Sequence, residues 1–351
     1  MMHIGKNIGI RHIGLRFNSN LSKSIPISEI TPQLSNKRIY FYALPITTKK
    51  TFIHCKYNND IFPNGKETLE NKLINKFTTI WKNFSTSDAS INKKVVKIIN
   101  QVLSKIPWLE TCLLSIPSQK FITRKLCEDK EREEKSESES ESQTTSFVTH
   151  DTIISKNLKS EDLEQFDYYY PKGLTNSKIM LETFRPEFKQ QYEIHRKGIY
   201  KDLLLMPLTI PFALVPLLPN IPGFYLLYRI YCHIKVIASL KFLIGLLKDL
   251  HFKFHEVDNL TEIYLSTNDI KIQSNVLEHL ALINENNSLD NPNDIEGKFL
   301  EMDEKLLISK DVAEKLCEVF DDKECTEKLM FAIEQESKHL ADREANNVND
   351  E

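Results

Sequence analysis

The sequence predicts a mainly α-helical, membrane-associated protein with a proline-rich transmembrane or re-entrant hairpin, a small N-terminal β element and an acidic helical C-terminal region. Three observations support this fold class. Residues 203–228 form a run of 26 residues without a charged side chain, and apolar residues recur at spacings of three and four elsewhere in the chain. The net charge is +14 over residues 1–127, −2 over 128–250 and −15 over 251–351. This asymmetry indicates that the two ends meet different surroundings or face each other.

The first 28 residues have the composition of a mitochondrial presequence. They hold four basic residues and no acidic one, the basic residues being Lys6, Arg11, Arg16 and Lys23. A secretory signal would need an apolar core of about 7–15 residues, which this segment lacks. We therefore expect residues 1–28 to be a presequence, with a disordered basic tail as the alternative.

Residues 29–127 form a basic region of mixed character. The aromatic and β-branched runs Arg38 to Ala43 and Thr51 to Tyr57 are separated by turn-forming residues, which favours a small β-hairpin. From residue 68 the apolar spacing lengthens to three and four, which predicts two amphipathic helices that end at Pro107.

Two further regions differ sharply in composition. Residues 128–160 begin with a polar stretch, 128–142, that holds eight acidic residues, three basic residues and four serines, including an alternating Ser/Glu run over 136–142. No core can form there, so we predict a disordered linker. Residues 251–351 are acidic and again helical in period. Two apolar stripes carry that prediction, one of Val276, Leu280 and Ile283 and one of Val312, Leu316, Val319 and Phe320.

The uncharged segment 203–228 lies within a predicted membrane region, residues 161–250. It is long enough to cross the hydrocarbon core of about 30 Å. However, five prolines interrupt it, and each removes a backbone donor and breaks a regular helix; they are Pro207, Pro211, Pro216, Pro219 and Pro222. A kinked span or a re-entrant hairpin that turns near residues 219–223 and continues as a helix over 224–247 fits this pattern. A peripheral helix pair in the interface and a soluble core helix are the alternatives.

Basic residues gather on both sides of this segment. His195 and Arg196 precede it, and Arg229 and His233 lie on one face of the helix that follows. Two interpretations stay open for these four residues. They could contact anionic lipid at the membrane surface, or they could form an ionisable cluster along a transport path.

The motifs of common enzymes are absent from the sequence. No phosphate-binding glycine loop, H-E-x-x-H or G-x-S-x-G sequence occurs, and the six cysteines form no C-x-x-C pair. We therefore expect no catalytic, cofactor-binding or metal site. Nucleic acid is also not expected as a partner.

Several motifs resemble the fungal mitochondrial potassium/proton exchange-related proteins. They are Ile106-Pro107-Trp108, Tyr169-Tyr170-Pro171, His195-Arg196-Lys197, the run from Pro207 to Pro216, and Pro219-Asn220-Ile221-Pro222. The resemblance implies an inner-membrane protein that serves matrix potassium homeostasis as a component or regulator of potassium/proton exchange. A hairpin in the inner membrane would leave both flanking regions in the matrix. Because one hairpin is too small to enclose an ion path alone, we expect further copies of this chain or other membrane proteins as partners. The alternative is a membrane-tethered scaffold in the matrix that contacts anionic lipid or an acidic partner.

Overall fold

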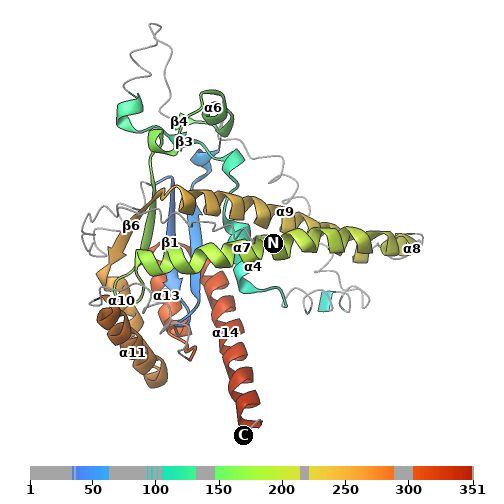
Figure 1. Cartoon of the computed structure of the whole chain (residues 1–351). Coiled ribbons are helices and arrows are strands. Elements are labelled where there is room, and N and C mark those ends of the chain that lie inside the picture. The colour runs from blue at the N-terminus through green and yellow to red at the C-terminus, as the bar shows by residue number, and fades with distance from the viewer. Residues whose placement is uncertain are drawn as a thin grey trace, which may run out of the picture.

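The structure is a computed structural model that describes residues 37–62, 105–131, 147–213, 221–287 and 303–349 (Figure 1). Five single positions are described as well, namely Leu34, Lys93, Val96, Lys97 and Gln101. The predicted presequence, the whole Ser/Glu run over 136–142 and most of the two amphipathic helices before Pro107 lie outside these residues.

A four-stranded sheet forms the centre of the fold, in the order β2-β1-β5-β6. The strands are β1 (Ile39–Pro45), β2 (Thr51–Tyr57), β5 (Phe166–Pro171) and β6 (Phe252–Val257). β1 and β2 pair antiparallel, with Ile39 opposite Tyr57 and Pro45 opposite Thr51. The predicted N-terminal hairpin is therefore confirmed.

The sequence prediction was incomplete for the other half of the sheet. β5 pairs parallel to β1, and β6 pairs parallel to β5. The strands thus come from three distant parts of the chain, whereas only a local hairpin was expected. All six residues of β5 are buried, as is usual for a strand covered on both faces.

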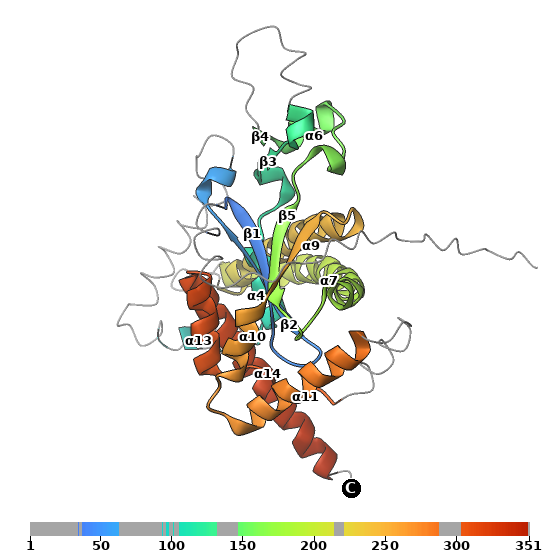
Figure 2. The same cartoon turned by 90° about the vertical axis from the view of Figure 1, so that its left-hand side faces the viewer.

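Helices cover the sheet on both sides, as the two views show together (Figures 1 and 2). On one side lie α10 (Asp258–Leu265), α13 (Lys310–Val319) and α14 (Lys323–Asn349). On the other lie α7 (Ser177–Leu205) and α9 (Ile221–Lys248), while α4 (Trp108–Ser115) packs against the edge strand β2. α11 (Ile270–Asn287) follows α10. The helices predicted from the two C-terminal stripes are confirmed as α11 and α13.

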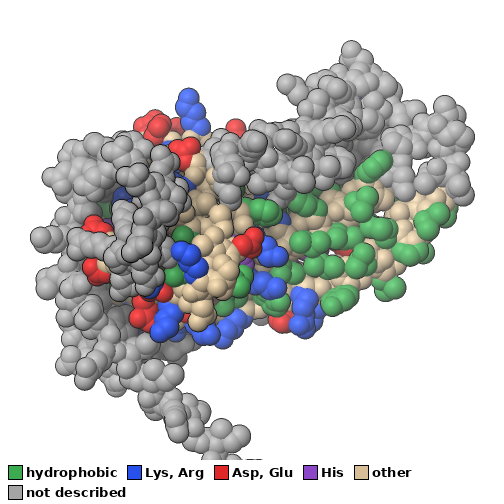
Figure 3. Space-filling view, turned by 90° about the horizontal axis from the view of Figure 1, so that it is seen from above, with side chains coloured by type: hydrophobic (Ala, Val, Ile, Leu, Met, Phe, Trp, Pro, Cys, Tyr) green, Lys and Arg blue, Asp and Glu red, His purple; other side chains and the backbone are tan. Residues whose placement is uncertain are grey.

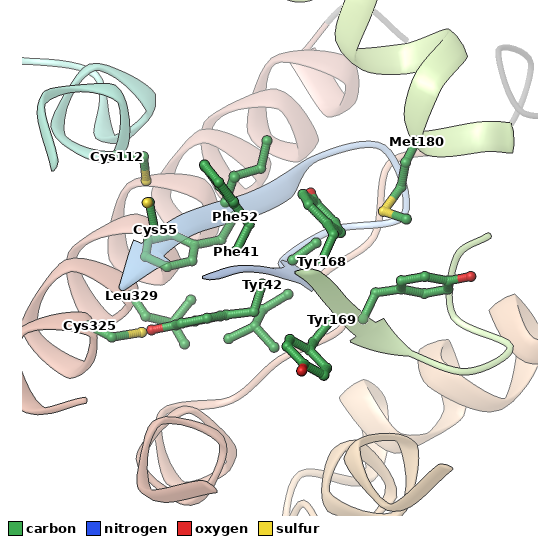
Figure 4. Packing of buried hydrophobic residues seen from close by; sticks show 14 of the residues in the cluster. Phe41, Tyr42, Phe52, Cys55, Cys112, Tyr168, Tyr169, Met180, Cys325 and Leu329 are labelled. Carbon is green, nitrogen blue, oxygen red and sulfur yellow. The ribbon is translucent and has the colours of Figure 1, made fainter. Parts of the chain in front are cut away.

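Aromatic side chains fill the core between these layers (Figure 4). On one face, the Tyr42 ring stacks on Phe320 with the centroids 4.1 Å apart. On the other, Phe166 of β5 makes an edge contact with Phe242 of α9, with the centroids 5.6 Å apart. One hydrophobic cluster extends from Leu34 to Ile333, so the basic N-terminal and acidic C-terminal regions share a single core.

A small subdomain contradicts the predicted extent of the linker. β3 (Arg124–Lys125) pairs with β4 (Phe147–Val148), and α6 (His150–Ser155) and a short 3-10 helix (Ser160–Asp162) follow. Val148 packs with Leu126 and Leu163 in a separate apolar cluster. Residues 147–160 are therefore ordered, and the linker cannot reach residue 160 as predicted.

α7 and α9 form a long antiparallel hairpin that runs away from the sheet (Figure 1). α7 begins where the Asn176 side chain accepts a hydrogen bond from the Ile179 amide, at 2.7 Å. It ends at Leu205 and continues as a 3-10 turn, η5 (Met206–Thr209), and the single turn α8 (Ile210–Ala213). The described parts of the uncharged run, residues 203–213 and 221–228, thus lie at the outer end of a hairpin and do not form one straight helix.

Candidate functional site

The hairpin brings two of the predicted site residues, His195 of α7 and His233 of α9, into direct contact. Their Nδ1 atoms lie 2.7 Å apart, and the two side chains are almost completely buried. Because a neutral imidazole carries one proton on two nitrogens, one Nδ1 must donate in this contact and the other must accept. The two tautomers are therefore coupled.

Arg229 forms a buried ion pair with Glu110 of α4. Its two terminal nitrogens lie 2.5 and 3.1 Å from the two carboxylate oxygens, a bidentate arrangement. The Arg229 and Glu110 side chains are 14% and 4% exposed. The pair joins the hairpin to the helix that packs on the edge of the sheet.

Asp202 of α7 lies beside His233, and the sequence analysis did not predict it as a site residue. Its Oδ2 atom lies 3.5 Å from His233 Nε2, is buried, and has no hydrogen-bond partner among the described residues. A signal was present in the sequence, because His195, Gly198 and Asp202 are spaced three and seven residues apart and so share one face of α7. We call His195, His233, Asp202, Arg229 and Glu110 the buried hairpin cluster.

Gly198 makes this cluster sterically possible. A Cβ atom at this position would lie 2.5 Å from Nε2 of the His233 ring, far inside van der Waals contact. Glycine inside a helix normally costs about 1 kcal/mol relative to alanine, but here it leaves the room that the His233 ring occupies.

We expect Gly198→Ala to displace His233 and to lower the melting temperature, although alanine is the better helix former. Gly245→Ala on α9 is the matched control, since a Cβ there would meet nothing within 4 Å. Thermal unfolding followed by circular dichroism compares the two. Equal or higher stability of Gly198→Ala would show that the close approach is not needed.

Arg196, the fourth predicted residue, does not join the cluster. It is exposed and pairs with Glu193 one turn earlier on α7, at 3.0 Å. Neighbouring residues on a helix point about 100° apart, so His195 and Arg196 cannot share a face. With Lys197 and Lys201, which are also exposed, Arg196 gives α7 a basic surface just before Leu203.

Burial determines the charge of the two histidines. Desolvation lowers the pKa of His195 to about 4, and the charges of His233 and Arg229 act in the same direction while Glu110 opposes them. Desolvation, together with Arg229, also lowers the pKa of His233. Both rings are therefore neutral at neutral pH.

Apolar side chains are exposed beyond the cluster, at the outer end of the hairpin. Figure 3 shows hydrophobic side chains gathered there, with lysine and arginine side chains closer to the body. We call this surface the apolar tip; its members are Leu203, Leu204, Leu205, Leu208, Ile210, Phe224, Leu227 and Tyr228, each at least 36% exposed. Single exposed apolar residues are ordinary, but a contiguous patch marks an interaction surface.

Three of the five prolines lie within or beside this tip. Pro207 is in η5, Pro211 is in α8 and Pro222 is in the first turn of α9. Pro216 and Pro219 lie outside the described residues. The predicted break of the helix at this segment agrees with the end of α7 at Leu205.

By length and composition, α9 could cross a membrane between Pro222 and Lys248, but half of its most apolar stretch of 18 residues is buried inside the protein. The buried residues are concentrated in its second half, where Val236, Leu240, Phe242, Leu243, Leu246 and Leu247 pack in the core. That half of α9 belongs to the folded body. The first half alone contributes to the apolar tip.

Comparison with known proteins identifies one family and two relatives. Residues 40–247 match the family described as mitochondrial K+-H+ exchange-related. A Saccharomyces cerevisiae protein described as uncharacterized is 31% identical over 241 residues, covering 67% of this chain and 71% of the relative. A Schizosaccharomyces pombe protein with the same description is 30% identical over 197 residues, covering 56% of this chain and 70% of the relative. No solved structure matches the chain.

Proposed function

Because this chain belongs to the mitochondrial K+-H+ exchange-related family, we propose that it is a component or regulator of potassium/proton exchange at the inner mitochondrial membrane. The observation that carries this proposal is the apolar tip, with the buried hairpin cluster directly behind it. The tip supplies the attachment to the membrane, and the cluster supplies ionisable groups close to the membrane surface.

The dimensions of the hairpin favour insertion into one leaflet. At about 1.5 Å per residue, the stretch from Leu203 to Ala213 measures roughly 16 Å, about half of the hydrocarbon core of about 30 Å. The second half of α9 cannot enter lipid without leaving the core of the protein. The hairpin therefore dips into the membrane and returns, and the folded body stays on one side, which we assign to the matrix.

The charge distribution supports the same orientation. Arg196, Lys197 and Lys201 are exposed on α7 immediately on the body side of Leu203. Basic side chains at this level would meet anionic headgroups while the leucines enter the acyl chains, and each such contact contributes about 1 kcal/mol near the surface. Anionic lipid is thus the partner that this region fits.

One hairpin is too small to enclose an ion path, since transporters build such paths from several membrane helices. The protein therefore acts with further copies of itself or with other membrane proteins. A scaffold that only holds the matrix face against anionic lipid is the second candidate, and the three exposed bases on α7 favour it.

The proposal predicts slower swelling of mitochondria in potassium acetate when the protein is absent, because exchange of potassium for protons admits the salt and water follows. The artificial exchanger nigericin should restore swelling, which separates lost exchange from general damage. Unchanged swelling after deletion of the gene would reject the exchange role.

Rescue with three chains then separates the two candidates. The intact chain should restore swelling, and a chain with Arg196→Ala, Lys197→Ala and Lys201→Ala tests the lipid contact. A chain with His195→Gln and His233→Gln tests the cluster without changing surface charge. Swelling that needs the surface bases but not the two histidines would favour the scaffold.

A further inference from the structure

Two cysteines are in contact where α13 turns into α14. The Sγ atoms of Cys317 and Cys325 lie 2.9 Å apart, and both side chains are almost completely buried. An S–S bond is about 2.05 Å long, so the two sulfur atoms need to approach by only about 0.9 Å to form one. A small movement of the two side chains is therefore sufficient to join them.

Two capping motifs fix the backbone on both sides of this contact. The Asp322 amide donates to the Cys317 carbonyl oxygen at 3.1 Å. The Asp321 amide donates to the Glu318 carbonyl oxygen at 3.0 Å, and these two bonds form a Schellman motif at the end of α13. Asp322 also caps the start of α14, because its Oδ1 atom accepts a hydrogen bond from the Cys325 amide at 3.1 Å. The backbone of each cysteine is thus bound to the same residue.

The sheet holds this turn in place. His54 Nε2 of β2 and the Tyr42 hydroxyl of β1 each lie 3.1 Å from Asp322 Oδ2. Burial alone would raise the pKa of Asp322, but the hydrogen bonds that it accepts, first of all from His54, lower that pKa to about 2. Asp322 is therefore ionised at neutral pH. Figure 4 shows Cys325 beside the hydroxyl end of Tyr42, so the cysteine pair lies against the sheet.

We propose that Cys317 and Cys325 are a disulfide site, and that the bond links α13 to α14 and locks the acidic C-terminal region onto the sheet. The oxidant that we assign is a small-molecule disulfide of the glutathione type. The inference goes beyond the proposed function and does not depend on it, since it concerns the C-terminal region alone.

The reaction is thiol–disulfide exchange in two steps. The thiolate of one cysteine attacks the small disulfide, so that a mixed disulfide forms and one glutathione thiolate leaves. The thiolate of the other cysteine then attacks the protein sulfur of the mixed disulfide, and the second glutathione thiolate leaves. Two protein thiols become one disulfide, and two electrons pass to the oxidant. The two protons from the cysteines are taken up by the two glutathione thiolates.

Burial determines when this exchange takes place. Only the thiolate reacts, and desolvation, together with the contact to Cys317, raises the pKa of Cys325 well above its ordinary value. Both sulfur atoms are also shielded from solutes by the fold. The exchange therefore needs the turn to open, and the bond forms as α13 and α14 pack together. Once formed, the bond is shielded from reductants in the same way.

Folding and oxidation favour each other by the same factor. The bond closes a short loop, residues 317–325. For a loop of this length, the lost chain entropy of the unfolded state favours folding about a hundredfold. Folding and oxidation form a closed thermodynamic cycle, so the folded chain must favour the disulfide over the dithiol about a hundredfold more than the unfolded chain does.

The test is disulfide mapping on the full chain, refolded from urea in mixtures of reduced and oxidised glutathione. Acid stops the exchange, an alkylating reagent marks the remaining thiols, and mass spectrometry counts them. With glutathione disulfide in excess we expect one internal bond and four alkylated cysteines of the six. Because trypsin cleaves after Lys323, the bond should join the peptides 316–323 and 324–328. Six alkylated cysteines, or a bond between any other two, would overturn the proposal.

The same mixtures measure the equilibrium constant of oxidation in the folded chain and in the chain held unfolded in urea. We expect the constant to be about a hundredfold larger for the folded chain. Equal constants would mean that the fold does not bring the two thiols together, which would overturn the proposal. Both measurements use the unmodified chain, so they do not depend on any variant folding correctly.

Thermal unfolding gives a further reading with matched variants. The oxidised chain should melt at a higher temperature than the reduced chain, and Cys317→Ala should abolish the difference. Cys127→Ala is the control, since Cys127 is only partly buried and its Sγ atom contacts the Glu161 carbonyl oxygen at 3.3 Å, away from the pair. It should keep the difference. A difference that persists in Cys317→Ala would contradict the assignment.

Discussion

Arg229→Ala is expected to destabilise the protein by about 3–5 kcal/mol, because it leaves the Glu110 carboxylate buried without its partner. Glu110 is 4% exposed, and both of its oxygens bind Arg229. The loss should appear as a lower midpoint of denaturant unfolding, measured on the full chain in detergent. Release of α4 from the hairpin should accompany it.

Two controls distinguish the effect of breaking the buried ion pair from the effect of removing any one positive charge. Arg196→Ala removes an exposed arginine that pairs within α7, and such surface pairs contribute only about 0–1 kcal/mol. The double variant Glu110→Gln with Arg229→Gln removes both charges and should recover most of the loss. Equal effects of Arg229→Ala and Arg196→Ala would contradict the buried ion pair.

Leu204→Asp combined with Leu208→Asp is expected to weaken binding to lipid vesicles at least about a hundredfold. Each leucine contributes about 1.5–3 kcal/mol when it is buried in an apolar medium, and a factor of ten corresponds to about 1.4 kcal/mol. Both side chains are mostly exposed, at 78% and 67%, so the folded body does not depend on them. Flotation with vesicles of mixed neutral and anionic lipid measures the partition.

Ile270→Asp is the matched control for this experiment. Ile270 is 82% exposed on α11, in the body of the protein and outside the apolar tip. It should leave flotation unchanged. Equal loss in both variants, or none in the tip variant, would show that the tip is not the surface that binds lipid.

Short-range sequence patterns predicted those elements that form between residues close together in the chain. The β1–β2 hairpin and the helices α11 and α13 follow from short-range periodicity, and the structure contains all of them. β5 and β6 escaped prediction because parallel pairing joins residues far apart in the chain, such as Phe166 and Phe252. The run Tyr168-Tyr169-Tyr170 was the available signal, since aromatic residues favour strands.

The candidate site was predicted only in part, because it also depends on contacts between residues that are far apart in the chain. A helical projection places Arg229 and His233 on one face, but it cannot show that His195 meets them from another helix. Arg196 was included because it adjoins His195 in sequence, and it points to solvent. Asp202 was overlooked because a charge at the end of an apolar run is normally a boundary, and only the packing of α7 on α9 turns it inward.

The depth of the hairpin in the membrane tests the central claim most directly. A fluorescent amino acid at position 208 or 224 would report contact with lipids brominated at known depths, and one at position 241 would report on the second half of α9. We predict strong quenching at 208 and 224 from the acyl chains of one leaflet, and none at 241. Quenching at 241 as strong as at 224 would mean that α9 spans the bilayer, and no quenching at 208 would mean that the tip stays outside it.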